Sequence, residues 1–87
     1  MTRYAIQLTD FMALRQSDPA LFLVLAANGE REPITVSTEE FDGEAAALAC
    51  SPEQAGALVR MIRTKYRSDQ VRIWRNDTGA ASAWKRV

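Results

Sequence analysis

The sequence predicts a small single-domain α+β sandwich: an antiparallel or mixed sheet of four or five strands covered by one main helix, about residues 51–67. Three observations predict it. The chain has 87 residues, enough for one core but not for two. Apolar residues alternate with polar ones near the start and the end of the chain, as in strands. Between them, one segment repeats its apolar residues at helical spacing.

The first element is a strand over residues 3–8, where Tyr4, Ile6 and Leu8 share one face. A short helix over residues 11–16 follows, with Thr9 or Asp10 as its N-cap. Ser17-Asp18-Pro19 should end it, because the residue before a proline avoids helical angles. The side chains of this helix expected near the core are those of Phe11, Met12 and Leu14.

The next segment, residues 20–27, is apolar throughout and has two interpretations. With Asp18 as N-cap, Pro19 at the first position and Gly29 as terminator, it would be a helix of two turns. Its length favours the other interpretation, a buried strand over residues 21–25. That strand would turn at Asn28-Gly29 and pair with the β-branched segment 34–37 as a hairpin.

A polar turn over residues 39–43 leads to a further strand, residues 44–50, which is unusually rich in alanine. Because alanine side chains are small, residues 45–49 could pack closely against a second copy of the chain. A homodimer is therefore one expectation for a domain with so small a core.

The main helix has the clearest signals in the chain. Ser51 is a typical N-cap, Pro52 suits the first helical position, and Gln54 stands where a capping box places Glu or Gln. The helix should end near residues 66–68. Its apolar face consists of Ala55, Leu58, Val59, Ile62 and Tyr66.

The chain should end in a hairpin of residues 71–75 and 80–87 around Asn76-Asp77-Thr78-Gly79. With a four-residue turn, Arg75 faces Ala80 and Trp74 faces Ala81. Val71, Ile73 and Trp84 would then lie in the core. Arg72 and Trp74 would share the other face, unless a one-residue bulge turns Trp74 inward.

Charge is distributed unevenly along a chain whose net charge is zero. Residues 1–50 contain eight acids and three bases, whereas residues 51–87 contain eight bases and three acids. Such a split indicates a charged binding surface. The bases expected on one helix and hairpin face, together with the neighbouring tryptophan, are Arg60, Arg63, Arg67, Arg72, Arg75 and Trp74.

This basic face has three interpretations. It could be neutralised by the acids of the first half, could bind a protein, or could bind nucleic acid while Trp74 stacks on a base. The neutral chain disfavours nucleic acid, whose affinity depends on uncompensated positive charge. The acidic residues Glu39, Glu40, Asp42 and Glu44 form a second, weaker candidate surface. They match no calcium-loop spacing, so we expect no metal.

Catalytic chemistry has little support in the sequence. Histidine is absent, which removes the commonest general base and metal ligand. The four glycines are isolated, so no phosphate-binding loop is expected. Cys50, just before the main helix, is the remaining candidate nucleophile, but it fits a small buried residue better. A single cysteine and the lack of a signal peptide or long apolar run favour the cytoplasm.

The sequence therefore favours a non-enzymatic protein-binding module without a cofactor: an inhibitor, adaptor or accessory subunit that acts by steric occupation of a protein partner through its charged patches. Small proteins of phages and mobile elements that inhibit host machinery are of this kind. The alternatives are a nucleic-acid-binding domain that uses the basic face with Trp74, and an enzyme built on Cys50.

Overall fold

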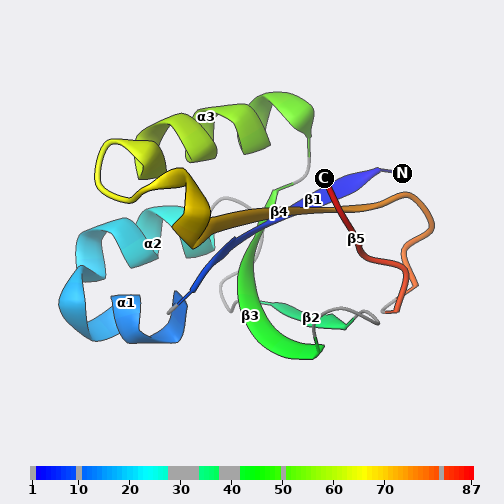
Figure 1. The fold of residues 1–87 in the computed structure, drawn as a ribbon, viewed down its shortest axis with the longest axis horizontal. Coiled ribbons are helices and arrows are strands. Elements are labelled where there is room, and N and C mark those ends of the chain that lie inside the picture. The colour runs from blue at the N-terminus through cyan, green and yellow to red at the C-terminus, as the bar shows by residue number, and fades with distance from the viewer. Residues whose placement is uncertain (1, 10, 28–33, 38–41, 50, 81) are drawn as a thin grey trace.

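Five strands form one antiparallel sheet in the order β2-β3-β1-β4-β5, as the computed structural model shows (Figure 1). The structure describes residues 2–9, 11–27, 34–37, 42–49, 51–80 and 82–87, with the backbone alone for residues 42–44 and 48. The predicted α+β class is confirmed. The elements are β1 (Arg3–Leu8), α1 (Phe11–Ser17), α2 (Pro19–Ala27), β2 (Ile34–Ser37), β3 (Asp42–Ala49), α3 (Pro52–Arg63), a 3-10 turn (Ser68–Gln70), β4 (Val71–Asn76) and β5 (Lys85–Arg86).

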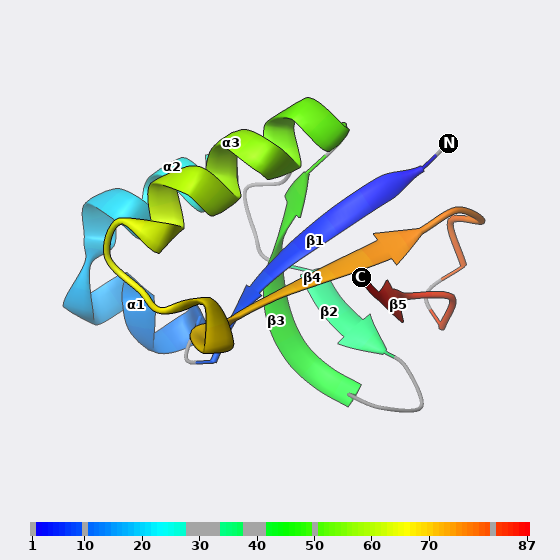
Figure 2. The same cartoon turned by 45° about the horizontal axis from the view of Figure 1, so that its top comes forward.

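The three helices cover one face of this sheet, with α3 running across it and α1 and α2 packed together at one end (Figures 1 and 2). Ile6 and Leu8 of β1 point to this face, where they join Phe11 of α1, Leu25 of α2 and Ile62 of α3 in the main core. The α3 helix packs chiefly on β1 and β3. On this face the helices cover the sheet as the sequence predicts, but three helices do so and not one main helix alone.

The opposite face of the sheet encloses a second, smaller core. There β3 bends so that β2 curls back under the central strands (Figure 1). Ala5 of β1, Val36 of β2 and Ala46 of β3 pack with Trp74 and Trp84, and all five are at most 6% exposed. Trp84 thus lies in this second core, and the prediction that it joins Val71 and Ile73 was wrong.

The alanine-rich strand β3 lies between β2 and β1, and its buried alanines pack into the main core on one side and into the second core on the other. Ala46, Ala47 and Ala49 have no exposed surface. Small side chains suit a strand that must accept packing from helices on one side and from tryptophans on the other. The expectation that this strand could pack against a second copy of the chain is therefore wrong.

Residues 20–27 form the helix α2 and not the strand that their length favoured. Asp18 caps it, because its Oδ1 accepts a hydrogen bond from the backbone N–H of Leu21 at 3.2 Å. Pro19 occupies the first helical position, where its missing N–H costs nothing. Consequently β2 pairs with β3, with Val36 opposite Glu44, and makes no hairpin with residues 21–25.

The N-terminus of α3 follows the sequence signals, since Ser51 Oγ accepts a hydrogen bond from the N–H of Gln54 at 3.2 Å. Ala55, Leu58, Val59 and Ile62 are buried as predicted, whereas Tyr66 is only partly buried. The helix ends at Arg63, a turn earlier than expected. Thr64 Oγ1 donates to the carbonyl of Met61 at 2.7 Å, which tightens the last turn. Met12, expected near the core, is 49% exposed.

The final hairpin has a longer connection than a four-residue turn. Trp74 pairs with Arg86 and Arg75 with Lys85, so both predicted pairings were wrong. The buried Asn76 organises the connection: its Oδ1 accepts from the N–H groups of Thr78 and Gly79, and its Nδ2 donates to the carbonyl of Ala80. Gly79 has φ +83°, which suits a residue without a Cβ.

Within the described ranges, no helix is both long and apolar enough to cross a membrane.

We expect the hydrogen bond between the neighbouring strands β1 and β4 in the second core to be important for stability. Trp74 Nε1 donates to Gln7 Oε1 at 2.8 Å, and both side chains are at most 2% exposed. Trp74→Phe removes this donor and leaves the Gln7 amide without a partner among the described residues, which should cost on the order of 1–3 kcal/mol of unfolding free energy.

Urea denaturation measures this cost, with Trp84→Phe as the matched control. Trp84 lies in the same core, and its side chain makes no hydrogen bond with any described residue. If the two variants lose equal stability, the hydrogen bond contributes nothing beyond packing. Adding Gln7→Leu to Trp74→Phe should recover part of the loss, because it removes the unpaired amide.

Candidate protein-binding surfaces

The structure does not bring the six predicted partner-binding residues onto one face. Trp74 is 1% exposed and hydrogen-bonded in the second core, so it cannot contact a partner in this conformation. Side chains alternate along β4, so Arg72 lies on the same side of the sheet as Trp74, away from α3. Arg75 points to the opposite side. The predicted cluster is therefore divided by the sheet.

Arg60 and Arg63 remain together, on the wall of an open groove between α3 and the sheet. The groove has a volume of about 650 Å³. Tyr4, Val59 and Ile73 give it an apolar lining, and both arginines are exposed along its α3 side. It can accept an apolar side chain next to a negative charge.

The acids of the described part of the chain neutralise three of the other bases. Lys65 Nζ lies 2.7 Å from Asp18 Oδ2, Arg75 Nε lies 2.9 Å from Asp77 Oδ1, and Arg67 Nε lies 3.6 Å from Asp69 Oδ1. The hydrogen bond from Arg75, followed by that from Thr2, lowers the pKa of Asp77, and Asp77 in turn raises the pKa of Arg75. Of these three pairs, the one between Lys65 and Asp18 joins the two halves of the chain.

The acidic candidate surface lies largely outside the described residues. Glu39 and Glu40 are not described, and of Asp42 and Glu44 only the backbone in β3 is given. Cys50 also lies outside the described residues. Among the residues that the structure does describe, no cluster of three or more possible metal ligands occurs.

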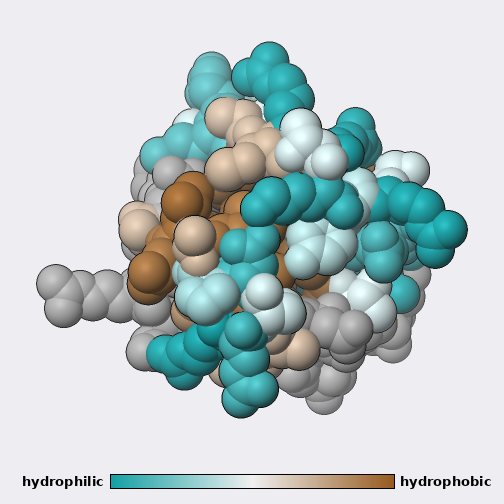
Figure 3. Space-filling model, turned by 90° about the vertical axis from the view of Figure 1, so that its left-hand side faces the viewer, coloured by the Kyte–Doolittle hydropathy of each residue, from teal (hydrophilic) through white to brown (hydrophobic). Residues whose placement is uncertain are grey.

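A surface that sequence reasoning missed lies on the outer side of α2. Four of its residues at helical spacing are exposed and apolar: Ala20, Leu23, Val24 and Ala27. Leu23 is 65% and Val24 47% exposed, and Met12 of α1, the helix packed against α2, is 49% exposed. Hydrophobic atoms accordingly gather on this side of the molecule (Figure 3). We call these five residues the α2 face. The signal for it in the sequence was a segment, residues 19–27, that follows a helix N-cap residue and contains no charged residue.

Polar groups border the α2 face. Arg15 places its guanidinium carbon 5.2 Å from the centre of the Phe22 ring, and the pair of Asp18 with Lys65 lies at the start of α2. An apolar centre with a polar border is the usual arrangement of a protein-binding surface.

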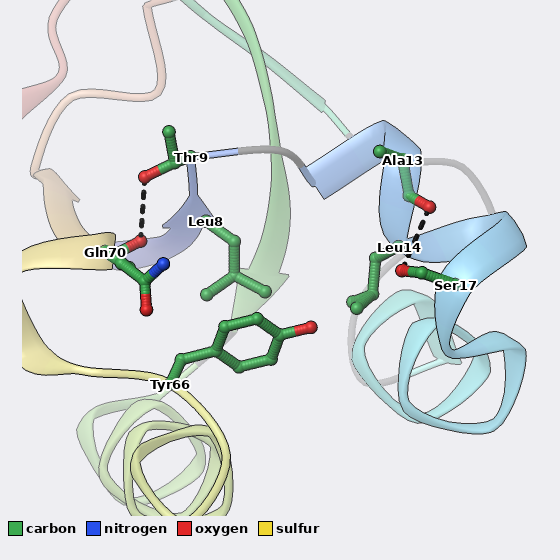
Figure 4. A pocket seen from close by; sticks show the side chains of 7 residues that line it. All are labelled: Leu8, Thr9, Ala13, Leu14, Ser17, Tyr66 and Gln70. Atoms are coloured by element: carbon green, nitrogen blue, oxygen red, sulfur yellow. Dashed lines mark hydrogen bonds between the residues drawn. The ribbon is translucent and has the colours of Figure 1, made fainter.

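A small pocket of about 190 Å³ opens between α1 and the segment that follows α3 (Figure 4). The Tyr66 ring extends across it towards Leu14. Two of its hydroxyl groups already donate to the backbone: Ser17 Oγ to the carbonyl of Ala13 and Thr9 Oγ1 to that of Gln70. The pocket is also smaller than the roughly 300 Å³ at which ligand sites usually begin, so it is a poor candidate site.

Comparisons with protein-family models, curated proteins and solved structures give no match to this chain, so its function must be inferred from its own residues.

The pair of Asp18 with Lys65 predicts a pH dependence. The hydrogen bond from Lys65 and that from the Leu21 N–H lower the pKa of Asp18, and Asp18 raises the pKa of Lys65. The stability from Asp18 is therefore present above the pKa of an unfolded aspartate and is lost as pH falls through the lowered pKa. That from Lys65 is lost only as pH rises through its raised pKa.

An NMR titration of the Asp18 carboxyl carbon tests whether Lys65 lowers the pKa of Asp18. In Lys65→Met the pKa of Asp18 should rise, but only part of the way, because the Leu21 N–H still donates to it. Arg67→Met, which removes a nearby base paired with Asp69, should leave it unchanged. An unchanged pKa of Asp18 in Lys65→Met would show that the ion pair does not form in solution.

Proposed function

We propose that this chain is a non-enzymatic protein-binding module, an inhibitor, adaptor or accessory subunit, that binds an apolar surface of a partner protein through its α2 face. One observation carries the proposal. The α2 helix is apolar on its buried side and equally apolar on its outer side, where Leu23 is 65% exposed. A helix that is apolar all round is normally covered on all sides.

The energetics support a partner at this position. Covering an exposed Leu or Val side chain contributes about 1.5–3 kcal/mol when burial is complete. Leu23, Val24 and Met12 are all about half exposed or more, so together they can provide the apolar centre of an interface. No residue of α2 is charged, and a partner therefore binds here without the desolvation of an ion.

The basic residues then have a supporting role. Arg60 and Arg63 are exposed and have no ion pair among the described residues. Their charge can accelerate the encounter with an acidic partner, since complementary charge raises association rates more than it raises affinity. While this domain covers the binding surface of the partner, the partner would act less well on its own target.

Leu23→Asp tests the α2 face. A charge at the centre of an apolar interface must be desolvated on binding, so quantitative capture of the partner from the source cell should fall by at least about tenfold. Because Leu23 is largely exposed, the folded domain should tolerate the change, which circular dichroism can verify. Ala80→Asp is the matched control: it adds the same charge at an exposed apolar residue in the connection between β4 and β5. Equal capture by wild type and Leu23→Asp would contradict the proposal.

The nucleic-acid alternative loses its stacking residue, since Trp74 is buried. We therefore expect no binding of single-stranded or duplex oligonucleotides in fluorescence anisotropy, even at low salt, where phosphate contacts are strongest. Binding that weakens steeply with salt and disappears in Arg60→Glu/Arg63→Glu would instead support nucleic-acid recognition by the groove.

A further inference from the structure

We propose that the groove beside α3 binds the α3 helix of a second copy of this chain, in antiparallel orientation. This surface is distinct from the α2 face, and the inference does not depend on the proposed function. It follows from the order of charges along the exposed side of α3. One acid comes first, two small residues follow, and two bases come last: Glu53, Gly56, Ala57, Arg60 and Arg63. All of them except Ala57 also line the groove.

These charges are left over after the other ion pairs have formed. The described aspartates 18, 69 and 77 are each paired with a base of the same chain. Within the described ranges, Glu53, Arg60 and Arg63 have no ion pair, although all three are exposed on one side of the same helix. A complementary surface must therefore offer a base opposite Glu53 and an acid opposite Arg60.

A second copy of the chain offers this surface by symmetry. Glu53 and Arg60 are seven residues apart, about 10 Å along the helix, and their midpoint falls between Gly56 and Ala57. A two-fold axis through that midpoint places Glu53 of each copy opposite Arg60 of the other, so one contact is made twice. A parallel arrangement would place like charges together, which excludes it.

The residues at the midpoint permit close approach of the two helices. Gly56 has no side chain, and a Cβ built on it would meet nothing within 4 Å, so the space outside the helix is open. Ala57 beside it is exposed and small. The apolar lining of the groove, Tyr4, Val59 and Ile73, together with Val87, which is 73% exposed, gives the second helix surface to cover.

The dimer should be weak. The α3 helix has 12 residues and is about 18 Å long, so the interface lies below the roughly 1,200 Å² of stable complexes. Sedimentation equilibrium of the full chain from about 10 µM to about 500 µM should show a reversible monomer and dimer. The dimer should also weaken with added salt, because its two ion pairs are solvent-accessible.

Charge exchange between Glu53 and Arg60 is the decisive experiment. Glu53→Arg and Arg60→Glu each place like charges opposite each other in the homodimer, so each variant alone should self-associate at least about tenfold more weakly. An equimolar mixture of the two should associate again, because the two bases of the Glu53→Arg variant then face the two acids of the Arg60→Glu variant. Neither lost helix packing nor misfolding can produce this recovery.

Two further variants locate the contact. Gly56→Leu adds a large side chain at the midpoint, where a Cβ meets nothing within 4 Å, and should abolish the dimer. Arg67→Glu, beyond the end of α3, should leave the dimer unchanged. The inference is wrong if the chain stays monomeric at the highest concentration, or if the mixture of charge variants fails to associate. It is also wrong if Leu23→Asp abolishes the dimer and Glu53→Arg does not, because the α2 face would then be the contact between copies.

Discussion

The burial of both faces of the central strand β1 is the constraint on which the rest of this structure depends. Ile6 and Leu8 face the helices, while Ala5 and Gln7 face the second core, and none of the four is more than 3% exposed. A chain of 87 residues must therefore cover a sheet on two sides. It uses all three helices on one side and bends its own strands β3 and β2, with two tryptophans, over the other.

This arrangement explains why large parts of two helices remain exposed. Every described helix is committed to the same face of the sheet, and no described element is left to cover their outer sides. The outer side of α2 is apolar, whereas that of α3 is charged. Two surfaces of different chemistry result, one suited to desolvation by a partner and the other to an ion-paired contact.

The uneven distribution of charge along the chain has a limited structural role. Among the described residues, one ion pair, Asp18 with Lys65, joins the acidic half to the basic half. It ties the start of α2 to the segment after α3 and lies next to the N-cap hydrogen bond of Asp18 to Leu21. The other two pairs are local to the second half. The charges on the exposed side of α3 take part in none of these pairs, so they can act on a second molecule.

The sequence by itself determined the elements whose signals are local: the alternation in β1, and the N-cap and apolar face of α3. These features depend on neighbours within a few residues, so short-range spacing describes them well. Residues 20–27 were ambiguous because an all-apolar segment has no period, and packing against α1 and β3 supports the helix that Asp18 caps. Likewise, the orientation of Trp74 depended on Gln7, 67 residues away, and the division of the arginines depended on which side of the sheet each one faces. Tertiary structure decided these points, because each is set by contacts between segments that are distant in the sequence.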